Sequence, residues 1–440
     1  MLQDMTKFKD NGKTQNGKPR LVVIGGGFAG LNFIKKIDRK NWDITLIDRN
    51  NFHSFPPLFY QVASSGIAPT AISFPLRYEL RSKARGVNFN MGKVKKIDTV
   101  RKRVITQYDT IPYDKLVIAA GTTNNFYGIA GLQKTVYTMK SVAEALRCRN
   151  DILDRMERAA ITDDAETRRK LLTFTIVGGG PTGVEIAGAL GEMKKYILTR
   201  EYPHIAQDEV SVNIIEGSDR LLRTMSEKAS KEALIYMDHL MVNVHLGLAM
   251  ESYENNVIKF TNGSEMYSEM VIWTAGITGE DFVYEGVEPQ KGAGNRLVVD
   301  EFNRVQGVDD VFAIGDICIH QDEEYPRGCP QLAQVAIQQA KTLAYNLNHK
   351  SFEKPFKYVD KGTMATVGRN RAVVDLKHMH FNGTFAWFTW MLVHLLSLLG
   401  MRNKITVFIT WVWSYFTYSS GARLLIHPDR YPLRQRWGEK

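Results

Sequence analysis

Two short apolar runs, each followed by a glycine-rich loop, form the clearest pattern along the chain. The first run covers residues 21–24 and precedes a stretch of helical composition over 28–37. The second covers 174–177 and precedes a similar stretch over 184–198. A strand, a glycine loop and a helix in this order form a nucleotide-binding unit. The two copies lie about 150 residues apart, which is too far for a short-period solenoid repeat.

Strands and helices alternate through the rest of the chain. Strands are predicted over 42–47, 115–120, 210–215, 270–275 and 311–314, and again from Thr363 onward. Residues 98–113 alternate charged and β-branched side chains, as in a small antiparallel excursion, and helices are expected over 141–170 and 331–347. This alternation predicts an α/β protein with two Rossmann-like dinucleotide-binding domains.

The first loop reads Gly25-Gly26-Gly27-Phe28-Ala29-Gly30 and fits the pattern G-x-G-x-x-G. The glycines allow a tight turn, a close approach of the backbone to a pyrophosphate and close packing of the helix on the strand. Asp48 ends the next strand, where an acid binds a ribose hydroxyl in such units. A purely structural glycine turn is the alternative.

The second loop, Gly178-Gly179-Gly180-Pro181-Thr182-Gly183, repeats the pattern. Its acid is predicted to be Glu216, at the end of the following strand. A carboxylate there suits a ribose diol and repels a 2′-phosphate, which favours NADH over NADPH. Arg220 and Arg223 lie nearby and weaken that preference.

Composition limits the class of protein. The 440 residues are 44% hydrophobic and 24% charged, as in a globular chain of two or three domains. The net charge of +10 favours nucleic acid or anionic lipid as a partner. The three cysteines form no CxxC pair, so a disulfide framework or a zinc ribbon is excluded, and no metal site is predicted. The polar residues 1–18 have no apolar segment and are expected to be a disordered arm rather than a secretory signal.

Two apolar runs of about 15 residues close the chain, over 385–399 and 405–418, interrupted by 401–404. Each is shorter than the roughly 20 residues that a spanning helix needs. They predict two short helices lying in one leaflet. A buried helical hairpin, a transmembrane hairpin and a dimer interface are the alternatives. The aromatic and basic side chains suited to a membrane interface are Trp411, Trp413, Tyr415, Tyr418, Arg402, Lys404, Arg423, Arg430 and Arg434. The positive charge is therefore assigned to anionic lipid, not nucleic acid.

Two fingerprints in one chain, with Gly315-Asp316 after a late strand, resemble the two-dinucleotide-binding flavoprotein superfamily. The resemblance implies that the first unit binds FAD, that the second binds NADH, and that Asp316 accepts hydrogen bonds from the ribitol hydroxyls. Ala119-Ala120-Gly121 and Thr274-Ala275-Gly276 look like the strand-crossing motifs of that superfamily.

Within it, the chain is most similar to type II NADH dehydrogenases, nearly throughout from Arg20 onward. Residues 53–63 resemble the flavin-lining loop of that family, and 333–338 match its A-Q-x-A-x-Q quinone motif. Residues 180–185 and the aromatic, basic C-terminus are the other similar segments. The resemblance implies FAD-dependent electron transfer from NADH to a membrane quinone, menaquinone or ubiquinone, without proton pumping. It further implies a homodimer on the cytoplasmic face of a bacterial inner membrane.

Three residues are predicted to be catalytic. Glu185 is expected near the nicotinamide and the quinone, where partial burial raises its pKa and suits it to proton transfer; its alternative role is to complement a helix dipole. Gln334 and Gln338 share one helix face and offer NH₂ donors to a quinone carbonyl, or else only pack the helix.

Residues expected to contact FAD are Gly25, Gly27, Phe28, Ala29, Gly30, Asp48, His53, Gln61, Ala120, Gly121, Gly315, Asp316, Gln331, Leu332 and Ala333. Those expected to contact NADH are Gly178, Gly180, Pro181, Thr182, Gly183, Glu216, Ala275 and Gly276.

The predicted domains are an arm over 1–18, an FAD domain over 19–140 and 297–372, an NADH domain over 141–296 and a membrane-anchoring region over 373–440. Two other functions compete: a sulfide:quinone or ferredoxin-type flavin reductase, and a redox-sensing membrane protein without enzymatic activity. The positions of Cys148 and Cys318 favour buried, inert thiols over a thiol mechanism.

Overall fold

The computed structural model describes residues 17–417 and 421–425. The chain forms two compact units, each assembled from separate segments. Unit 1 comprises residues 1–54, 74–123 and 277–361, and unit 2 comprises 55–73, 124–276 and 362–440.

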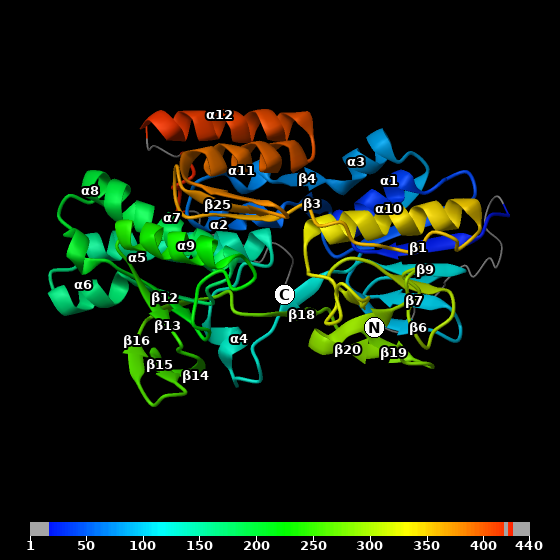
Figure 1. Ribbon diagram of the computed structural model, residues 1–440, viewed down its shortest axis with the longest axis horizontal. Helices are drawn as coiled ribbons and strands as arrows, with labels where there is room; N and C mark the ends of the chain where they lie inside the picture. Colours follow the sequence, from blue (N-terminus) through cyan, green and yellow to red (C-terminus); the bar gives the residue numbers. More distant parts are fainter. Residues whose placement is uncertain (1–16, 418–420, 426–440) are drawn as a thin grey trace, which may run out of the picture. The chain divides into compact units, whose positions relative to one another are not determined.

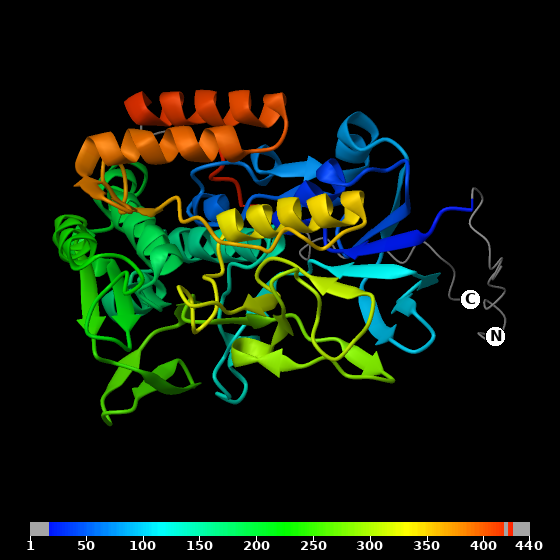
Figure 2. The ribbon, with the colours of Figure 1, turned by 45° about the vertical axis from the view of Figure 1, so that its right-hand side comes forward.

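A five-stranded parallel sheet forms the centre of unit 1, in the order β22-β9-β1-β2-β5. Its strands are β1 (Arg20–Ile24), β2 (Asp43–Asp48), β5 (Val87–Met91), β9 (Lys115–Ile118) and β22 (Val311–Ala313). Helices α1 (Phe28–Lys36) and α10 (Ala333–His349) pack side by side, as Figures 1 and 2 show. The four buried residues of β1, Leu21, Val22, Val23 and Ile24, fit a strand covered on both faces. Helix α10 begins two positions after the predicted start at 331 because Leu332 is still extended.

Two smaller sheets with parallel and antiparallel pairs complete unit 1. The predicted excursion over 98–113 is confirmed as a meander of β6 (Val94–Asp98), β7 (Arg103–Thr106) and β8 (Thr110–Pro112), joined by β19 (Val283–Glu285). A second sheet contains β20 (Lys291–Gly292), β21 (Arg296–Val299) and β23 (Cys318–His320). Remaining elements are β3 (Phe52–Ser54), β4 (Ser73–Pro75), α3 (Leu76–Lys83), β10 (Thr122–Asn124) and β18 (Ile277–Gly279).

Unit 2 repeats the parallel arrangement with four strands in the order β13-β12-β11-β17. These are β11 (Thr173–Val177), β12 (Ser211–Glu216), β13 (Val242–Leu246) and β17 (Met270–Trp273). Its helices are α2 (Phe59–Ala63), α4 (Leu132–Thr135), α5 (Val142–Ala160), α6 (Ala165–Leu171), α7 (Pro181–Glu192), α8 (Leu198–Glu201) and α9 (Glu227–His239). A meander follows, β14 (Met250–Glu254), β15 (Val257–Phe260) and β16 (Glu265–Tyr267). The helix predicted from 184 begins earlier because Pro181 occupies its first turn, where a missing N–H costs nothing.

The C-terminal part of unit 2 is a three-stranded sheet followed by two helices. The strands are β24 (Thr363–Thr366), β25 (Ala372–Leu376) and β26 (Met379–Asn382), and the helices are α11 (Gly383–Ser397) and α12 (Met401–Thr417). Helix α12 lies beside α11, which packs on β25 (Figures 1 and 2).

The two predicted helices are thus confirmed, but the predicted interruption over 401–404 is wrong. The chain turns earlier, at Gly400 with φ +78°, and Met401 already starts α12. Among the residues that the structure describes, no helix is both long and apolar enough to cross a bilayer.

The bounds of the units differ from the predicted domain limits for physical reasons. Residues 124–140 belong to unit 2 because the Tyr137 N–H donates to Val271 O and the Trp273 N–H donates to Tyr137 O. Residues 277–296 belong to unit 1, where β20 pairs with β21. The described residues from 373 onward belong to unit 2 and form no third unit. Most of the predicted arm over 1–18 lies outside the described residues.

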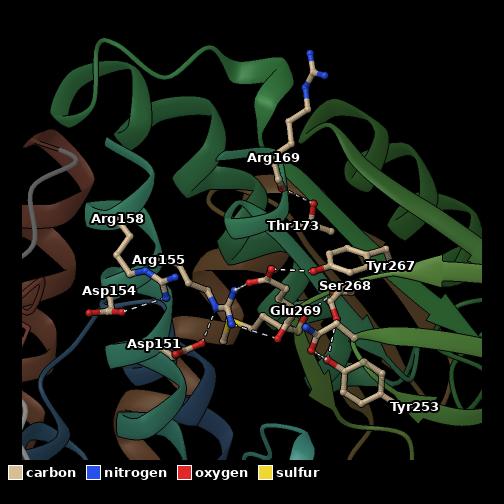
Figure 3. A network of polar contacts seen from close by, with 12 residues as sticks. Asp151, Asp154, Arg155, Arg158, Arg169, Thr173, Tyr253, Tyr267, Ser268 and Glu269 are labelled. Atoms are coloured by element: carbon tan, nitrogen blue, oxygen red, sulfur yellow. Dashed lines mark hydrogen bonds and ion pairs between the residues drawn. The ribbon is translucent and has the colours of Figure 1, made fainter. Parts of the chain in front are cut away.

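A buried ionic network fixes α5 to the start of β17 (Figure 3). The Arg155 guanidinium donates to Asp151 at 2.7 Å, to the Glu269 carboxylate at 2.9 Å and to Glu269 O at 3.2 Å. Tyr267 donates to the other Glu269 oxygen at 2.9 Å. Burial raises the pKa of Glu269, but hydrogen bonds from Tyr267 and Arg155 outweigh it and lower that pKa below its ordinary value. Glu269 therefore contributes stability that is lost as the pH falls.

We expect Arg155→Met to lower the free energy of unfolding by about 2 kcal/mol, because it leaves two partly buried carboxylates without their partner. The matched control Arg158→Met, which removes a 57% exposed side chain 3.9 Å from Asp154, should change it by less than about 0.5 kcal/mol. Urea unfolding of both variants measures the difference, which should shrink at acidic pH as Glu269 becomes protonated. Equal losses in the two variants would contradict this role.

Candidate functional site

The two glycine loops have the same construction at their first position. Gly25 and Gly178 have φ of +103° and +113°, a region that favours glycine. A Cβ on Gly25 would lie 2.3 Å from Ala119 O, and one on Gly178 would lie 2.7 Å from the backbone of Ala275. The loop backbone therefore passes so close to the end of the neighbouring strand that a residue with a Cβ at either position would clash with it.

The last glycine of each loop brings the helix onto the strand. A Cβ on Gly30 would lie 1.9 Å from Gly25 O, and a Cβ on Gly183 would lie 1.8 Å from Gly178 O. Any larger residue would push the first helical turn away from the loop. The predicted role of these glycines in close helix–strand packing is consistent with this geometry.

The middle glycine of each loop faces open space. No atom lies within 4 Å of a Cβ built on Gly27 or Gly180, and both residues have extended backbone that any residue adopts. Each is the N-cap of its helix, α1 or α7, and neither helix start is capped by a side chain. The first N–H groups of each helix thus face a space that a pyrophosphate would fit.

A carboxylate at the end of the second strand supports each loop. Asp48 accepts the Gly26 N–H at 2.6 Å, and Glu216 accepts the Gly179 N–H at 2.6 Å. The backbone N–H two positions after each acid donates to its other oxygen, at 2.7 and 2.8 Å. Burial raises the pKa of Asp48 more than these hydrogen bonds lower it. The equivalent contacts make the two loops structural repeats.

His53 holds the first loop through a contact with its backbone. Its Nδ1 lies 2.9 Å from Gly26 O, and its ring packs edge-on against Phe28 with centroids 5.5 Å apart. Burial lowers the pKa of His53, so the ring is neutral and Nδ1 carries the proton donated to the carbonyl. His53 therefore holds the loop in place, and its predicted contact with FAD stays a prediction.

The late Gly-Asp turn packs on the start of α10. Gly315 has φ +78°, and a Cβ there would lie 3.1 Å from the Ala29 Cβ and 3.3 Å from the Ala336 Cβ. Gln331 donates to Asp316 O at 3.1 Å. Leu332 is the N-cap of α10, with Ala333 as first residue and no capping side chain. The turn and the uncapped helix start therefore lie together in unit 1.

The buried Gln339 was not predicted from the sequence. Its Oε1 accepts the Gly315 N–H at 2.7 Å and its Nε2 contacts the Cys318 sulfur at 3.3 Å. It follows the A-Q-x-A-x-Q motif directly, so only its proximity to Gln338 could have drawn attention to it. It fixes the turn that carries Asp316.

Gln334 and Gln338 bind the segment that ends unit 1. Gln338 donates to Val359 O at 2.9 Å and accepts the Val359 N–H at 3.0 Å. Gln334 accepts the Lys361 N–H at 3.0 Å. Both side chains are half-buried. The shared helix face is confirmed, whereas no pattern in the sequence indicated these backbone partners.

Glu185 lies in unit 2, one turn into α7 from Gly180, and is buried. Burial raises the pKa of Glu185 to about 8, although the neighbouring polar groups of Thr366 and Trp390 work in the other direction. The carboxyl group therefore holds a proton in neutral solution. This agrees with the expected direction of its pKa shift and gives α7 a proton donor close to the second loop.

The strand-crossing motifs flank the loops as predicted. Gly121 has φ +71°, next to the predicted FAD residue Ala120. In unit 2 the Tyr127 hydroxyl donates to Ala275 O at 3.0 Å, and a Cβ on Gly276 would lie 2.5 Å from that hydroxyl oxygen. Tyr127 was missed, because nothing in its neighbours along the chain indicates that it reaches this turn.

Gln61 has protein partners at both ends of its amide. Its Nε2 donates to the Tyr60 hydroxyl at 3.0 Å, and its Oε1 accepts the Trp411 indole N–H at 2.8 Å. Both contacts lie in unit 2. They support a role in orienting Tyr60, and the predicted contact of Gln61 with FAD stays a prediction.

All three cysteines are free and buried, as expected. Burial raises the pKa of Cys318 to about 12 and that of Cys329 to about 11, and also raises the pKa of Cys148. Such thiols do not ionise near neutral pH and are poor nucleophiles. They offer no support for a sulfide or dithiol mechanism. No cluster of metal-binding side chains occurs among the described residues.

The outer faces of α11 and α12 are apolar. Their exposed large hydrophobic residues are Phe385, Phe388, Leu392, Val393, Leu396, Met401, Ile405, Phe408, Ile409, Val412, Trp413 and Phe416. Two of the residues predicted to face a membrane interface do not lie on the exposed surface. Trp411 lies on the inner face of α12, where it is buried and hydrogen-bonded to Gln61. The Arg423 side chain is mostly buried and forms an ion pair with Glu201. Tyr418, Arg430 and Arg434 lie outside the described residues.

Known proteins resemble this chain over most of its length. Residues 19–340 match the Pyridine nucleotide-disulphide oxidoreductase family, and residues 361–418 match the NDH2 C-terminal domain. The Mycobacterium tuberculosis "Type II NADH:quinone oxidoreductase Ndh" is 34% identical over 421 residues, covering 91% of this chain and 89% of the relative. An "Internal alternative NAD(P)H-ubiquinone oxidoreductase A1, mitochondrial" from Solanum tuberosum is 30% identical over 431 residues, covering 90% and 86%.

Solved structures show the same fold. The NDH2 of Plasmodium falciparum in complex with NADH superposes with a TM-score of 0.84 at 22% identity, covering 93% of this chain and 100% of that one. The sulfide:quinone oxidoreductase of Aquifex aeolicus gives a TM-score of 0.69 at 19% identity, covering 93% and 96%. With two matching glycine loops, the α/β fold and these relatives, the chain belongs to the type II NADH:quinone oxidoreductases of the pyridine nucleotide-disulphide oxidoreductase family.

Proposed function

We propose that unit 1 binds FAD and unit 2 binds NADH, so that each unit supplies the binding site for one of the two dinucleotides in the NADH:quinone reaction of the family. The observation that carries the proposal is the open space above Gly27 and Gly180, at two uncapped helix starts. Each space is backed by an acid that holds the loop, Asp48 or Glu216. Backbone N–H groups and a helix dipole there suit a pyrophosphate.

Bound FAD would accept a hydride from NADH and pass two electrons to the quinone. The protein residues bind and orient around that chemistry. Gly25, Gly30 and Gly315 keep backbone close to the cofactor side of unit 1. The uncapped start of α10, at Leu332 and Ala333, directs a positive helix end that favours negative charge on the flavin ring.

Glu185 is the group proposed to deliver a proton during quinone reduction. Its carboxyl is protonated below about pH 8 because burial destabilises the anion. A donor with a pKa near the working pH transfers a proton most effectively. The location on α7, beside the second loop, supports a position near the nicotinamide.

Gln334 and Gln338 are proposed to form part of a quinone site on α10. Each NH₂ group has two hydrogens, and Gln338 uses one of them on Val359. Both side chains would then orient the 359–361 segment, and Gln338 would offer its remaining hydrogen to a quinone carbonyl. Ala333 and Ala336 leave room for a flat ring beside them.

Helices α11 and α12 are proposed to seat the enzyme in one leaflet of an anionic membrane. Their apolar outer faces suit the acyl boundary, and the exposed Arg402 suits the headgroups. A quinone could then reach the protein from the lipid. A homodimer on the cytoplasmic face of a bacterial inner membrane, with menaquinone or ubiquinone as acceptor, belongs to the same proposal.

Anaerobic mixing tests the proposed division directly. We expect the yellow protein to bleach on addition of NADH, to bleach little on NADPH, and to recover rapidly on a soluble quinone. Gly27→Val should lose bound FAD, because its side chain enters the proposed pyrophosphate space, where a Cβ has no protein atom within 4 Å. Gly180→Val should keep the flavin spectrum but raise the KM for NADH by at least about 10-fold. If Gly180→Val loses flavin and Gly27→Val keeps it, the assignment of the two units is wrong.

Glu185→Gln should slow flavin reoxidation by quinone about 100-fold, since general acid catalysis contributes factors of this size, and should slow reduction by NADH much less. The wild-type reoxidation rate should fall as the pH rises through about 8, and the variant should lack this fall. Stopped-flow absorbance separates the two half-reactions.

A stability measurement checks the titration independently of catalysis. A buried acid with a raised pKa loses stability as the pH rises from its ordinary value toward its value in the fold. The wild type should therefore become less stable than Glu185→Gln between pH 5 and about 8, by up to about 1.4 kcal/mol per pH unit. Parallel stability curves would mean that Glu185 is ionised throughout.

A further inference from the structure

Four side chains of unit 2, three of them buried and Gln61 half-buried, form a hydrogen-bonded chain that begins on α12. The Trp411 indole N–H donates to Gln61 Oε1 at 2.8 Å, and Gln61 Nε2 donates to the Tyr60 hydroxyl at 3.0 Å. The Tyr60 hydroxyl lies 3.0 Å from Thr366 Oγ1. The chain thus joins α12 to α2 and then to β24.

The indole at its start fixes the direction of the whole chain. An indole N–H can only donate, so it selects the orientation of the Gln61 amide that turns Oε1 toward α12. The NH₂ group then faces Tyr60 and occupies an acceptor position of its oxygen. Burial raises the pKa of Tyr60, so it keeps its proton, which it can donate to Thr366 Oγ1.

The far end of the hydrogen-bonded chain lies on a strand that packs against the helix of Glu185. Thr366 belongs to β24, the edge strand of its sheet. The neighbouring Val367 N–H donates to Arg371 O inside the sheet, so the Thr366 N–H points to the other side. β24 packs on α7, which carries Glu185, and the Thr366 backbone lowers the pKa of Glu185. The strand that Tyr60 fixes is therefore the strand that lies beside Glu185.

The chain is unsuited to carrying protons. Beyond Thr366 it continues only through backbone, and its other end consists of an amide and an indole, none of which exchanges protons readily near neutral pH. The hydrogen-bonded chain is suited to holding positions, because a polar network largely shielded from water rigidifies the groups that it joins.

Helix α12 carries this contact on the face opposite to its exposed apolar residues. Asn403, Val407 and Trp411 are buried and four positions apart, so they share one face. Asn403 donates to Ser73 O at 2.9 Å, which gives the same face a second polar anchor. Ile405, Ile409 and Phe416 are exposed on the other side.

We propose that Trp411, Gln61 and Tyr60 are positioning residues through which helix α12 holds the Thr366 strand against Glu185. The inference rests on the proposed role of Glu185 in the quinone step. The helix with the apolar outer face would then also fix the surroundings of the proton donor. Binding of α12 to a membrane and the pKa of Glu185 would therefore be linked.

Hydrogen exchange of the holoenzyme in detergent tests the proposal without turnover. Trp411→Phe keeps an aromatic ring and removes the indole N–H, and Tyr60→Phe removes only the hydroxyl. In both variants the amide of Thr366 should exchange about fivefold faster, because the strand is held less firmly. The matched control Trp413→Phe, on the exposed face of the same helix, should leave that exchange unchanged.

The pH dependence of flavin reoxidation gives the second readout. The Thr366 backbone lowers the pKa of Glu185, so a strand that is held less firmly in Trp411→Phe should let the apparent pKa rise by about half a unit. The Trp411→Phe/Tyr60→Phe double variant should shift it no further than Tyr60→Phe alone, because both act through one chain. Additive shifts, or equal exchange at Thr366 in Trp411→Phe and Trp413→Phe, would overturn the proposal.

Failure of the proposed role of Glu185 would look different. If Glu185→Gln kept the alkaline fall in rate, Glu185 would not be the titrating donor, yet faster exchange at Thr366 in Trp411→Phe would still support the positioning chain.

Discussion

The close approach of backbone to backbone at the two glycine loops is the constraint on which the molecule depends. Gly25 and Gly178 cross the neighbouring strand ends at distances that exclude a Cβ, and Gly30 and Gly183 bring each helix onto its loop in the same way. These contacts direct the first N–H groups of α1 and α7 into open space. A dinucleotide is a long ligand with a charged centre, so a fixed pyrophosphate position decides where both of its ends lie.

The same constraint explains how much could be predicted from the sequence. Strand, glycine loop, helix and acid follow one another along the chain, so the sequence pattern alone pairs Asp48 and Glu216 with their loops. It does not identify Gln339 or Tyr127. Gln339 reaches a turn that precedes it by 24 positions, and Tyr127 reaches one that lies 148 positions later. Such contacts depend on tertiary packing, which no local pattern encodes.

The C-terminal helices show a different limit of sequence reasoning. Apolar and aromatic composition predicted their existence correctly. It could not separate Trp411, which is buried, from Trp413, which is 62% exposed, because both fit an aromatic interface belt. Periodicity offered the missing signal: Asn403, Val407 and Trp411 recur at four-residue spacing, and a polar residue in that series indicates a face that meets protein.

Helix α7 combines two requirements that favour opposite surroundings. Its first turn must remain open to an anionic ligand, whereas Glu185, one turn later, keeps its proton only if water is excluded. Close packing of the C-terminal sheet on the helix satisfies both. A Cβ on Gly188 would lie 2.7 Å from the Gly368 N, so the β24–β25 turn rests directly on the backbone of α7. The sheet covers the helix from Glu185 onward and leaves its start open. The region matched by the NDH2 C-terminal domain thus provides more than an apolar outer surface, because it also forms the dry surroundings in which a carboxylic acid remains protonated at neutral pH.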